Sequence, residues 1–274
     1  MSGFCRFSIV AGFVSALLAT QPALPETDLS AVPKEDAVSE SNAIRKNIDG
    51  VLATLSSVAM KEKISRFTGV GDTARKLDSF ETEVSIADGV ERYTGVRGHH
   101  RTYRHISEIG GLWSFGEVVT MLRATRDLID ASTTNRDWRE AGIPPEHASG
   151  QDEASDVRVI PFQGTSVDRK WFVTAHGLIR WLDFTGTIRI SRRTGEIERL
   201  TWTSAPEVAG TDIAGILWDV TFSSVTIAGN VINMPSDSVY RVVRKGHAQM
   251  AEWNLTEYTA LGRYGSTANV WFGQ

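Results

Sequence analysis

The sequence predicts a mixed α+β fold, mainly β, in which one strongly curved antiparallel sheet of about ten strands, an unclosed barrel, wraps around two helices. Three observations predict it. The chain has 274 residues, 41% of them hydrophobic, which is enough for one sizeable core. Most of its second half alternates apolar and polar residues with a period of two, and turn residues separate these segments at hairpin distances. Two segments have the apolar spacing of a helix.

The first residues have the pattern of an export signal. Arg6 precedes an uncharged run from Phe7 to Ala19, which is too short to cross the roughly 30 Å of a bilayer but fits the apolar part of a secretory signal. We therefore expect residues 1–25 to be a signal peptide and the protein to be exported to the periplasm or cell envelope. The alternative is a buried N-terminal helix. No other apolar run has the length of a stable transmembrane anchor.

Composition argues against several classes of function. Cys5 is the only cysteine and lies inside the signal, so the mature protein would have no disulfide and no thiolate metal site. There are 29 basic and 33 acidic residues, which gives a formal charge of −4. Non-specific attraction to nucleic acid requires a basic excess, so we expect no nucleic-acid partner; a local basic patch stays open. The oligomeric state stays open.

The first half of the chain predicts a linker, a helix and a hairpin. Residues 26–41 are rich in proline, serine and acidic side chains without periodicity, which predicts a disordered linker. A single curved-sheet domain follows over residues 42–274. Helical spacing of apolar residues predicts a helix at Asn42–Leu55. Alternation from Phe80 to Val96, around Asp88-Gly89, predicts a hairpin.

A second helix is predicted after this hairpin. Ser114 and Glu117 have the spacing of a capping box. One face of the helix would then be apolar, formed by Phe115, Val118, Val119, Leu122 and Ile129.

The remaining chain predicts a series of strands, with a surface loop at Ala141–Asp156 before them. Short turns join consecutive strands, so the pairing would be antiparallel. One side of each strand is apolar and must be covered, and the two helices are available for that. The predicted strands are Val157–Phe162, Lys170–His176, Arg180–Ile190, Glu196–Thr203, Ile216–Ile227, Asp237–Arg244, Ala248–Tyr258 and Asn269–Phe272.

This order of elements resembles a known family. The hairpin from Phe80 to Tyr93, the glycine-rich approach to the Ser114 helix, the Ile188–Leu200 hairpin with Thr-Gly-Glu-Ile at its turn, and the Gly229–Pro235 turn and strand are similar to exported bacterial proteins of the outer-membrane lipoprotein carrier (LolA-like) half-barrel superfamily. The resemblance implies an unclosed barrel with helices on its concave side, where the carriers hold acyl chains. It contains no diagnostic catalytic or ligand motif, so no functional residue is transferred.

Two short motifs resemble catalytic or cofactor loops. Gly69–Ala74 fits a G-x-G-x-x-A phosphate loop, but such a loop must lead into a helix and here a strand pattern follows, so we interpret it as a turn. Asp183-Phe-Thr-Gly resembles the Asp-Thr-Gly loop of aspartic proteases. The second carboxylate that this chemistry requires is missing from the sequence pattern, and Asp183 is predicted to face outward from a strand.

Arg97–His105 is the densest group of basic and titratable side chains. His99 and His100 would point to opposite faces of an extended chain, which disfavours a shared metal. Contact with anions or lipid head groups, and a charged strand edge exposed to solvent, are the other interpretations. We expect no metal and no cofactor.

Eight tryptophans stand out in a chain of this size. Packing in the core is one explanation, and the lining of a cavity between sheet and helices is the other. The candidate ligand-binding residues for such a cavity are Trp113, Phe115, Val119, Leu122, Trp202, Trp218, Val220 and Phe222.

Three functions follow from these features. The first is an exported, non-catalytic binding protein for an apolar or lipid-like ligand, with a lipid or acylated protein as partner. The second is an envelope interaction or sensor module with a filled core, which an exposed apolar patch would favour. The third is an enzyme, which would require groups such as His99, His105, His176, Asp183 and Glu117 to converge. We expect the protein not to be an enzyme.

Overall fold

A computed structural model describes residues 34–87, 90–95, 117–129, 156–175, 177–227 and 229–263. In chain order the elements are α1 (Lys34–Leu55), β1 (Val58–Thr68), η1 (Gly71–Thr73), β2 (Arg75–Ala87), β3 (Val90–Thr94), α3 (Val118–Leu128), β4 (Val157–Gly164), η3 (Ser166–Asp168), β5 (Phe172–Ala175), β6 (Leu178–Trp181), β7 (Phe184–Ser191), β8 (Ile197–Ser204), β9 (Ile213–Ile227), β10 (Asn230–Arg244) and β11 (His247–Arg263).

The strands form one large antiparallel sheet and one small one. The large sheet has nine strands in the order β3-β2-β1-β11-β10-β9-β8-β7-β4, and β5 pairs with β6 alone. Each pairing is antiparallel, and the large sheet is not closed into a barrel. The predicted fold class, mainly β with an antiparallel sheet and two helices, is confirmed for the described residues.

The two described helices differ from the prediction at their starts. α1 begins at Lys34, eight residues before the predicted Asn42, so the last part of the predicted linker is helical. In α3, Glu117 is the N-cap residue and has extended backbone angles. The predicted capping box, with Glu117 inside the helix, is therefore wrong; Ser114 lies outside the described residues. Neither helix has the length and apolar character needed to cross a membrane.

Most strands match their prediction, with three differences. Strand β1 was not predicted, although it lies inside the large sheet. The predicted strand Arg180–Ile190 is two strands, β6 and β7, because the chain turns at Leu182, whose N–H donates to the Trp171 carbonyl oxygen over 2.9 Å. Asp183 lies between these strands, exposed, instead of within one. Asn269–Phe272 and most of Ala141–Asp156 lie outside the described residues.

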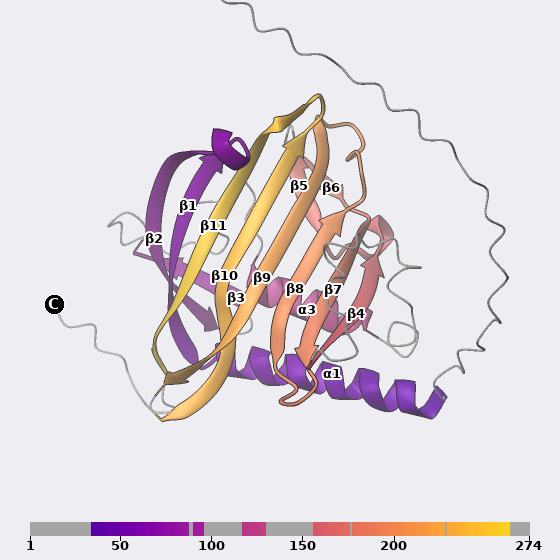
Figure 1. The fold of residues 1–274 in the computed structure, drawn as a ribbon, viewed down its shortest axis with the longest axis vertical. Coiled ribbons are helices and arrows are strands. Elements are labelled where there is room, and N and C mark those ends of the chain that lie inside the picture. Colours follow the sequence, from indigo (N-terminus) through magenta and orange to yellow (C-terminus); the bar gives the residue numbers. More distant parts are fainter. Residues whose placement is uncertain are drawn as a thin grey trace, which may run out of the picture. The chain divides into compact units, whose positions relative to one another are not determined.

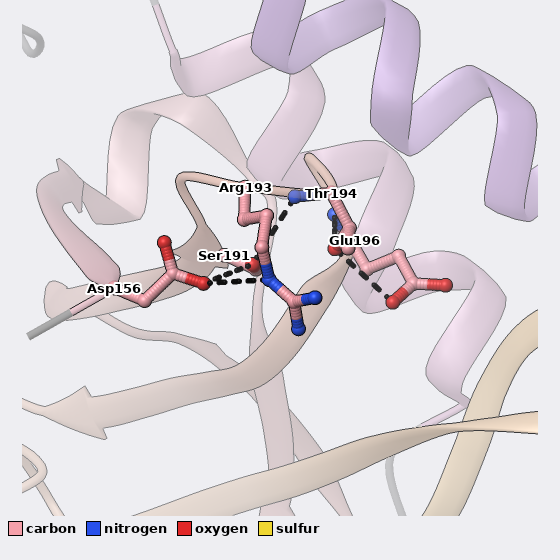
Figure 2. A network of polar contacts seen from close by, with 5 residues as sticks. All are labelled: Asp156, Ser191, Arg193, Thr194 and Glu196. Carbon is pink, nitrogen blue, oxygen red and sulfur yellow. Dashed lines mark hydrogen bonds and ion pairs between the residues drawn. The ribbon is translucent and has the colours of Figure 1, made fainter.

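The turn between β7 and β8 was predicted at Thr194-Gly195 and is confirmed. Gly195 has a positive φ of 74°. Side chains on both sides of the turn hydrogen-bond to one another, and Asp156, just before β4, joins them by accepting from Arg193 Nε over 3.3 Å (Figure 2). Asn47 of α1 donates to the Gly195 carbonyl oxygen over 2.9 Å, so α1 lies against this end of the sheet (Figure 1).

The large sheet is curved around α3. β3 and β4 are its two edge strands, and α3, which has 11 residues, contacts both. One short helix reaches both edges only if the sheet bends around it, so α3 lies on the inner side of the bend. We call this side, which carries Ile64, Phe80 and Trp218, the concave face and the other side the outer face. α1 packs on α3, where Asp49 and Arg126 form an ion pair at 2.6 Å.

On the concave face, glycine and phenylalanine alternate across β4 and β7. Phe162 lies opposite Gly186, and Gly164 lies opposite Phe184. A Cβ atom added to Gly186 would overlap the Phe162 ring and lie 2.6 Å from the Thr201 carbonyl oxygen, and one added to Gly164 would overlap the Phe184 ring. Each glycine therefore leaves the space that the ring of the other strand occupies.

This arrangement predicts that Gly186→Ala lowers the free energy of unfolding by about 1–3 kcal/mol, because the ring and the strand backbone must shift. Gly215→Ala is a matched control in β9, where an added Cβ meets nothing within 4 Å. Urea unfolding of both variants measures the difference. Equal midpoints for the two variants would contradict the proposed overlap.

Candidate functional site: the concave face

The candidate ligand-binding residues that the structure describes all lie in the core. Val119 and Leu122 are on the buried side of α3. Trp202 is on β8, and Trp218, Val220 and Phe222 are on β9; all are buried in one hydrophobic cluster with the helix residues. The structure thus brings these six residues together on the concave face. Trp113 and Phe115 lie outside the described residues.

Trp202 is at the centre of this apolar region. Its ring stacks on Phe184 with 4.3 Å between centroids, and meets Trp171 and Trp218 edge-on. Its indole Nε1–H donates to Thr125 Oγ1 of α3 over 3.0 Å. This buried hydrogen bond fixes the helix over the aromatic rings.

Two hollows formed by described residues lie elsewhere. One of about 520 Å³ is on the outer face of β7 and β8, where Thr185, Thr187, Thr201 and Thr203 form part of its lining. Another, of about 440 Å³, lies where α1 meets α3 and is bordered by Asp49 and other residues of both helices. Neither is lined by Trp202, Trp218, Val220 or Phe222.

The other part of the concave face contains polar side chains among apolar ones such as Ile64 and Phe80. One row of directly opposed residues crosses six strands and changes from aromatic to polar along its length. From β8 to β2 the row consists of Trp202, Trp218, Tyr240, Asn254, Arg66 and Asp78. Further buried polar residues on this face of β10, β11, β1, β2 and β3 are Ser238, Thr256, Glu62, Thr82, Glu91 and Tyr93, and Tyr258 is partly buried.

Asn254 is the unusual member of the row. Its side chain is 1% exposed, and neither its amide nitrogen nor its amide oxygen has a hydrogen-bond partner among the residues that the structure describes. A buried polar group left without a partner costs about 1–3 kcal/mol. Its neighbour Arg66, in contrast, is paired with Asp78, which accepts from Arg66 Nε over 2.6 Å. Asn254 therefore has an unused donor and an unused acceptor on the concave side of β11.

Glu91 connects the edge strand β3 to the start of α3. Its carboxyl accepts hydrogen bonds from the Tyr93 hydroxyl and, over 2.9 Å, from the Val119 N–H. The second bond satisfies one of the free N–H groups in the first turn of the helix. Burial raises the pKa of Glu91 to about 7, although both hydrogen bonds act in the opposite direction.

Glu62 lies near Glu91 on the same face of the sheet and is 4% exposed. It forms no hydrogen bond or ion pair with any residue that the structure describes. Burial, and after it the charges of Glu91 and Glu117, raise the pKa of Glu62 well above its ordinary value. The raised pKa favours the neutral carboxylic acid, and in that form Glu62 can both donate and accept hydrogen bonds.

The polar groups here are suited to hydrogen bonding. Among the residues that the structure describes, no three histidine, cysteine, aspartate or glutamate side chains are placed to hold a metal ion.

Periodicity did not single out Glu62, Glu91 or Asn254. These residues could have been found as polar residues at strand positions where the alternation calls for an apolar one. In β1, for example, Glu62 stands in the buried series Val58, Met60, Glu62 and Ile64.

Two of the short sequence motifs, Gly69–Ala74 and the one at Asp183, lie in the part of the chain that the structure describes, and both form turns. Gly69–Ala74 is the turn between β1 and β2 and leads into a strand, as interpreted. Asp183 accepts from the Ser166 N–H over 2.6 Å and holds the turn before β7. The segment Arg97–His105 and His176 lie outside the described residues.

No family model matches the sequence, and no curated protein sequence is similar to it. Among solved structures, a DUF1329 family protein from Desulfovibrio piger is similar at 8% identity, over 86% of this chain and 97% of that chain, with a TM-score of 0.32. A match this distant supports no conclusion about fold or function. The resemblance to the lipoprotein carriers therefore stays a prediction.

The buried carboxyls predict that the protein becomes less stable as pH rises. The folded state holds the Glu91 proton up to about pH 7, whereas the unfolded state releases it near 4.5. This contribution is complete below pH 4.5 and is lost as pH rises through about 7; such a shift corresponds to roughly 3 kcal/mol. Glu62 acts in the same direction.

Urea unfolding between pH 5 and pH 8 measures this effect. We expect Glu62→Gln to unfold at a higher urea concentration than the wild type at pH 8, and to flatten the pH dependence. Glu81→Gln, on the exposed face of β2 and paired with Lys61 at 3.2 Å, is the matched control and should keep the wild-type slope. An unchanged slope in Glu62→Gln would contradict the assignment.

Proposed function

We propose that this protein is exported to the cell envelope, with the periplasm as the expected compartment, and that it binds a lipid-like ligand there without catalysis. The signal pattern around Arg6 supports export. Support for the ligand class comes from the concave face, where an aromatic region and a polar region adjoin on the same side of one sheet.

The observation that carries the proposal is the buried, unpartnered amide of Asn254. It lies in the row that begins at Trp202, two strands from Trp218. An amphiphile on this face would place its apolar part toward the aromatic side chains and its polar part toward Asn254. A hydrogen bond from the ligand would then remove the cost of the unpartnered amide.

Neighbouring groups fit the same ligand. Thr256 and Tyr258 follow Asn254 along the concave side of β11, and Glu62 lies opposite Tyr258. The Tyr258 hydroxyl is 3.1 Å from Ser238 Oγ, which gives this strip a connected set of hydroxyl groups. A ligand with a hydrogen-bonding head group has several partners here, and each buried methylene of its chain would contribute about 0.8 kcal/mol.

The second predicted function, an interaction module, is supported at one place. Hairpin β5–β6 exposes large apolar side chains at the surface. This surface and the concave face are separate features, so a binding function for one does not exclude a function for the other.

Asn254→Leu tests the proposal, because it separates a binding role from a simple packing defect. Removal of the buried amide should raise the free energy of unfolding by about 1 kcal/mol. If the amide binds the ligand, the same variant should also retain about fivefold less of it, since one hydrogen bond is lost. Native mass spectrometry of protein recovered from the envelope of its own host, followed by organic extraction, measures the retained ligand.

Asn233→Leu in β10 is the control. Its amide nitrogen already donates to the Ile197 carbonyl oxygen over 3.0 Å, and its amide oxygen, like that of Asn254, is buried without a partner among the described residues. Because Asn233 is not in the row of the concave face, this variant should retain the ligand. The proposal is wrong if the wild type carries no extractable amphiphile and takes up no fluorescent long-chain fatty acid. It is also wrong if Asn254→Leu retains as much ligand as the wild type.

A further inference from the structure

Hairpin β5–β6 exposes one apolar face. Phe172 and Trp181 are directly opposite each other at its base, and Ile179 lies next to them on the same side. Phe172 is 42% exposed, Trp181 36% and Ile179 57%. Leu178, at the turn, is 55% exposed. Leu178 pairs with Ala175, so its side chain lies at the turn on the other side of the hairpin. We call these four exposed side chains, three on one side and Leu178 at the tip, the hairpin face.

At its base, the opposite side of the hairpin is packed on the protein. Val173 is 4% exposed, and Trp171, just before β5, is 6% exposed and contacts Trp202 in the core. The hydrogen bond from the Leu182 N–H to the Trp171 carbonyl oxygen ties the two ends of the hairpin together. The hairpin is thus a fixed platform, and its outward side chains do not fold back into the core.

The order of side chains along the hairpin face matches the depth profile of a bilayer surface. The aromatic pair Phe172 and Trp181, with ring centroids 5.1 Å apart, lies at the base, and the aliphatic Ile179 and Leu178 lie toward the turn. Tryptophan is enriched at the level of lipid head groups, and aliphatic side chains insert more deeply. A hairpin that entered turn-first would place each type at its preferred depth.

Basic residues are located where head groups would lie. Arg169 is exposed and Lys170 partly exposed, immediately before β5 at the base of the hairpin. Lys170 also pairs with Asp127 at 2.7 Å. Asp168 and Asp183, the nearby acidic residues in sequence, accept hydrogen bonds from Thr165 and from the Ser166 N–H. Arg169 therefore offers a positive charge that suits lipid phosphate.

The size of the hairpin face favours a lipid surface over a stable protein interface. Four side chains of roughly 200 Å² each, about half exposed, present about 400 Å². A stable protein interface buries about 800 Å² on each partner. Shallow insertion into a bilayer has no such threshold, because its strength increases with the apolar area that is buried.

We propose that the hairpin face docks on the surface of a phospholipid bilayer, with Leu178 and Ile179 among the upper acyl carbons and Trp181 at head-group level. The outer edges of β5 and β6 are not paired to the large sheet, so insertion stays shallow and these edges remain at the wet interface. This docking is independent of any ligand on the concave face.

Vesicle flotation tests the proposal, with vesicles of phosphatidylcholine alone and with added phosphatidylglycerol. The Leu178→Ser/Ile179→Ser variant should lose about tenfold or more of the bound fraction, because both deeper side chains become polar. Val231→Ser is the control: Val231 is 67% exposed at the start of β10, which is the opposite end of the sheet, and this variant should bind like the wild type. All proteins are recovered from the same envelope fraction, so any effect of the N-terminal segment is common to them.

A site-specific probe shows which residues enter the lipid. Ile179→Cys carries an environment-sensitive fluorophore in a Cys5→Ser background, and Val231→Cys is labelled in the same way as the control. We expect a blue shift with vesicles at position 179 and none at 231. The proposal is overturned if the wild type stays unbound to both kinds of vesicle, if the double serine variant binds equally well, or if the label at 179 does not shift.

Discussion

The fold depends on a single short helix that touches both edges of a nine-stranded sheet. α3 is held there by hydrogen bonds from opposite directions. Glu91 of the edge strand β3 receives the Val119 N–H at the start of the helix, and Trp202 of β8 donates to Thr125 one turn before its end. A sheet that must meet one helix with both edges has to bend, and this bend gives it an inner side.

The inner side is chemically uneven, and this unevenness distinguishes it from an ordinary core. Aromatic rings around Trp202 fill the part near β8, and the part near β11 and β1 contains polar side chains. Natural sequences usually avoid buried groups such as Asn254 and Glu62, because unpaired polar atoms weaken the fold. Departures from this rule are common at functional sites, where a cost in stability is accepted for binding. For this reason we propose this side of the sheet for ligand binding.

Much of the architecture was predictable because it depends on local periodicity. The hairpins around Thr194-Gly195 and Lys245-Gly246 formed as expected, since glycine at these turns adopts a positive φ and strict alternation flanks them. The early start of α1 was not predictable in this way. Its first turns are polar, and its ion pair between Glu40 and Arg158 of β4 joins residues that are far apart in the sequence. Long-range contacts of this kind leave no periodic pattern.

The same reasoning explains what was missed at the site. The aromatic residues on β8 and β9 follow the apolar alternation, so their position on the inner side could be predicted. β1 was missed because Glu62 interrupts its apolar alternation and because Lys61 and Lys63 increase its polar content. The residue that made the strand hard to detect is thus part of the site. Asn254 was missed because its neighbours, Tyr240 and Arg66, are known only once the register of β11 with β10 and β1 is known.

In β4 and β7, each phenylalanine ring lies over a glycine of the other strand, and this pairing limits how the protein can change during evolution. Phe162 and Gly186 fill one volume between them, and Gly164 and Phe184 fill another. A smaller ring leaves a void and a larger neighbour has no room, so a lineage must alter both members of a pair together or neither. In related chains these positions should therefore covary in twos, and the covariation should identify the β4–β7 register even where overall sequence identity has disappeared.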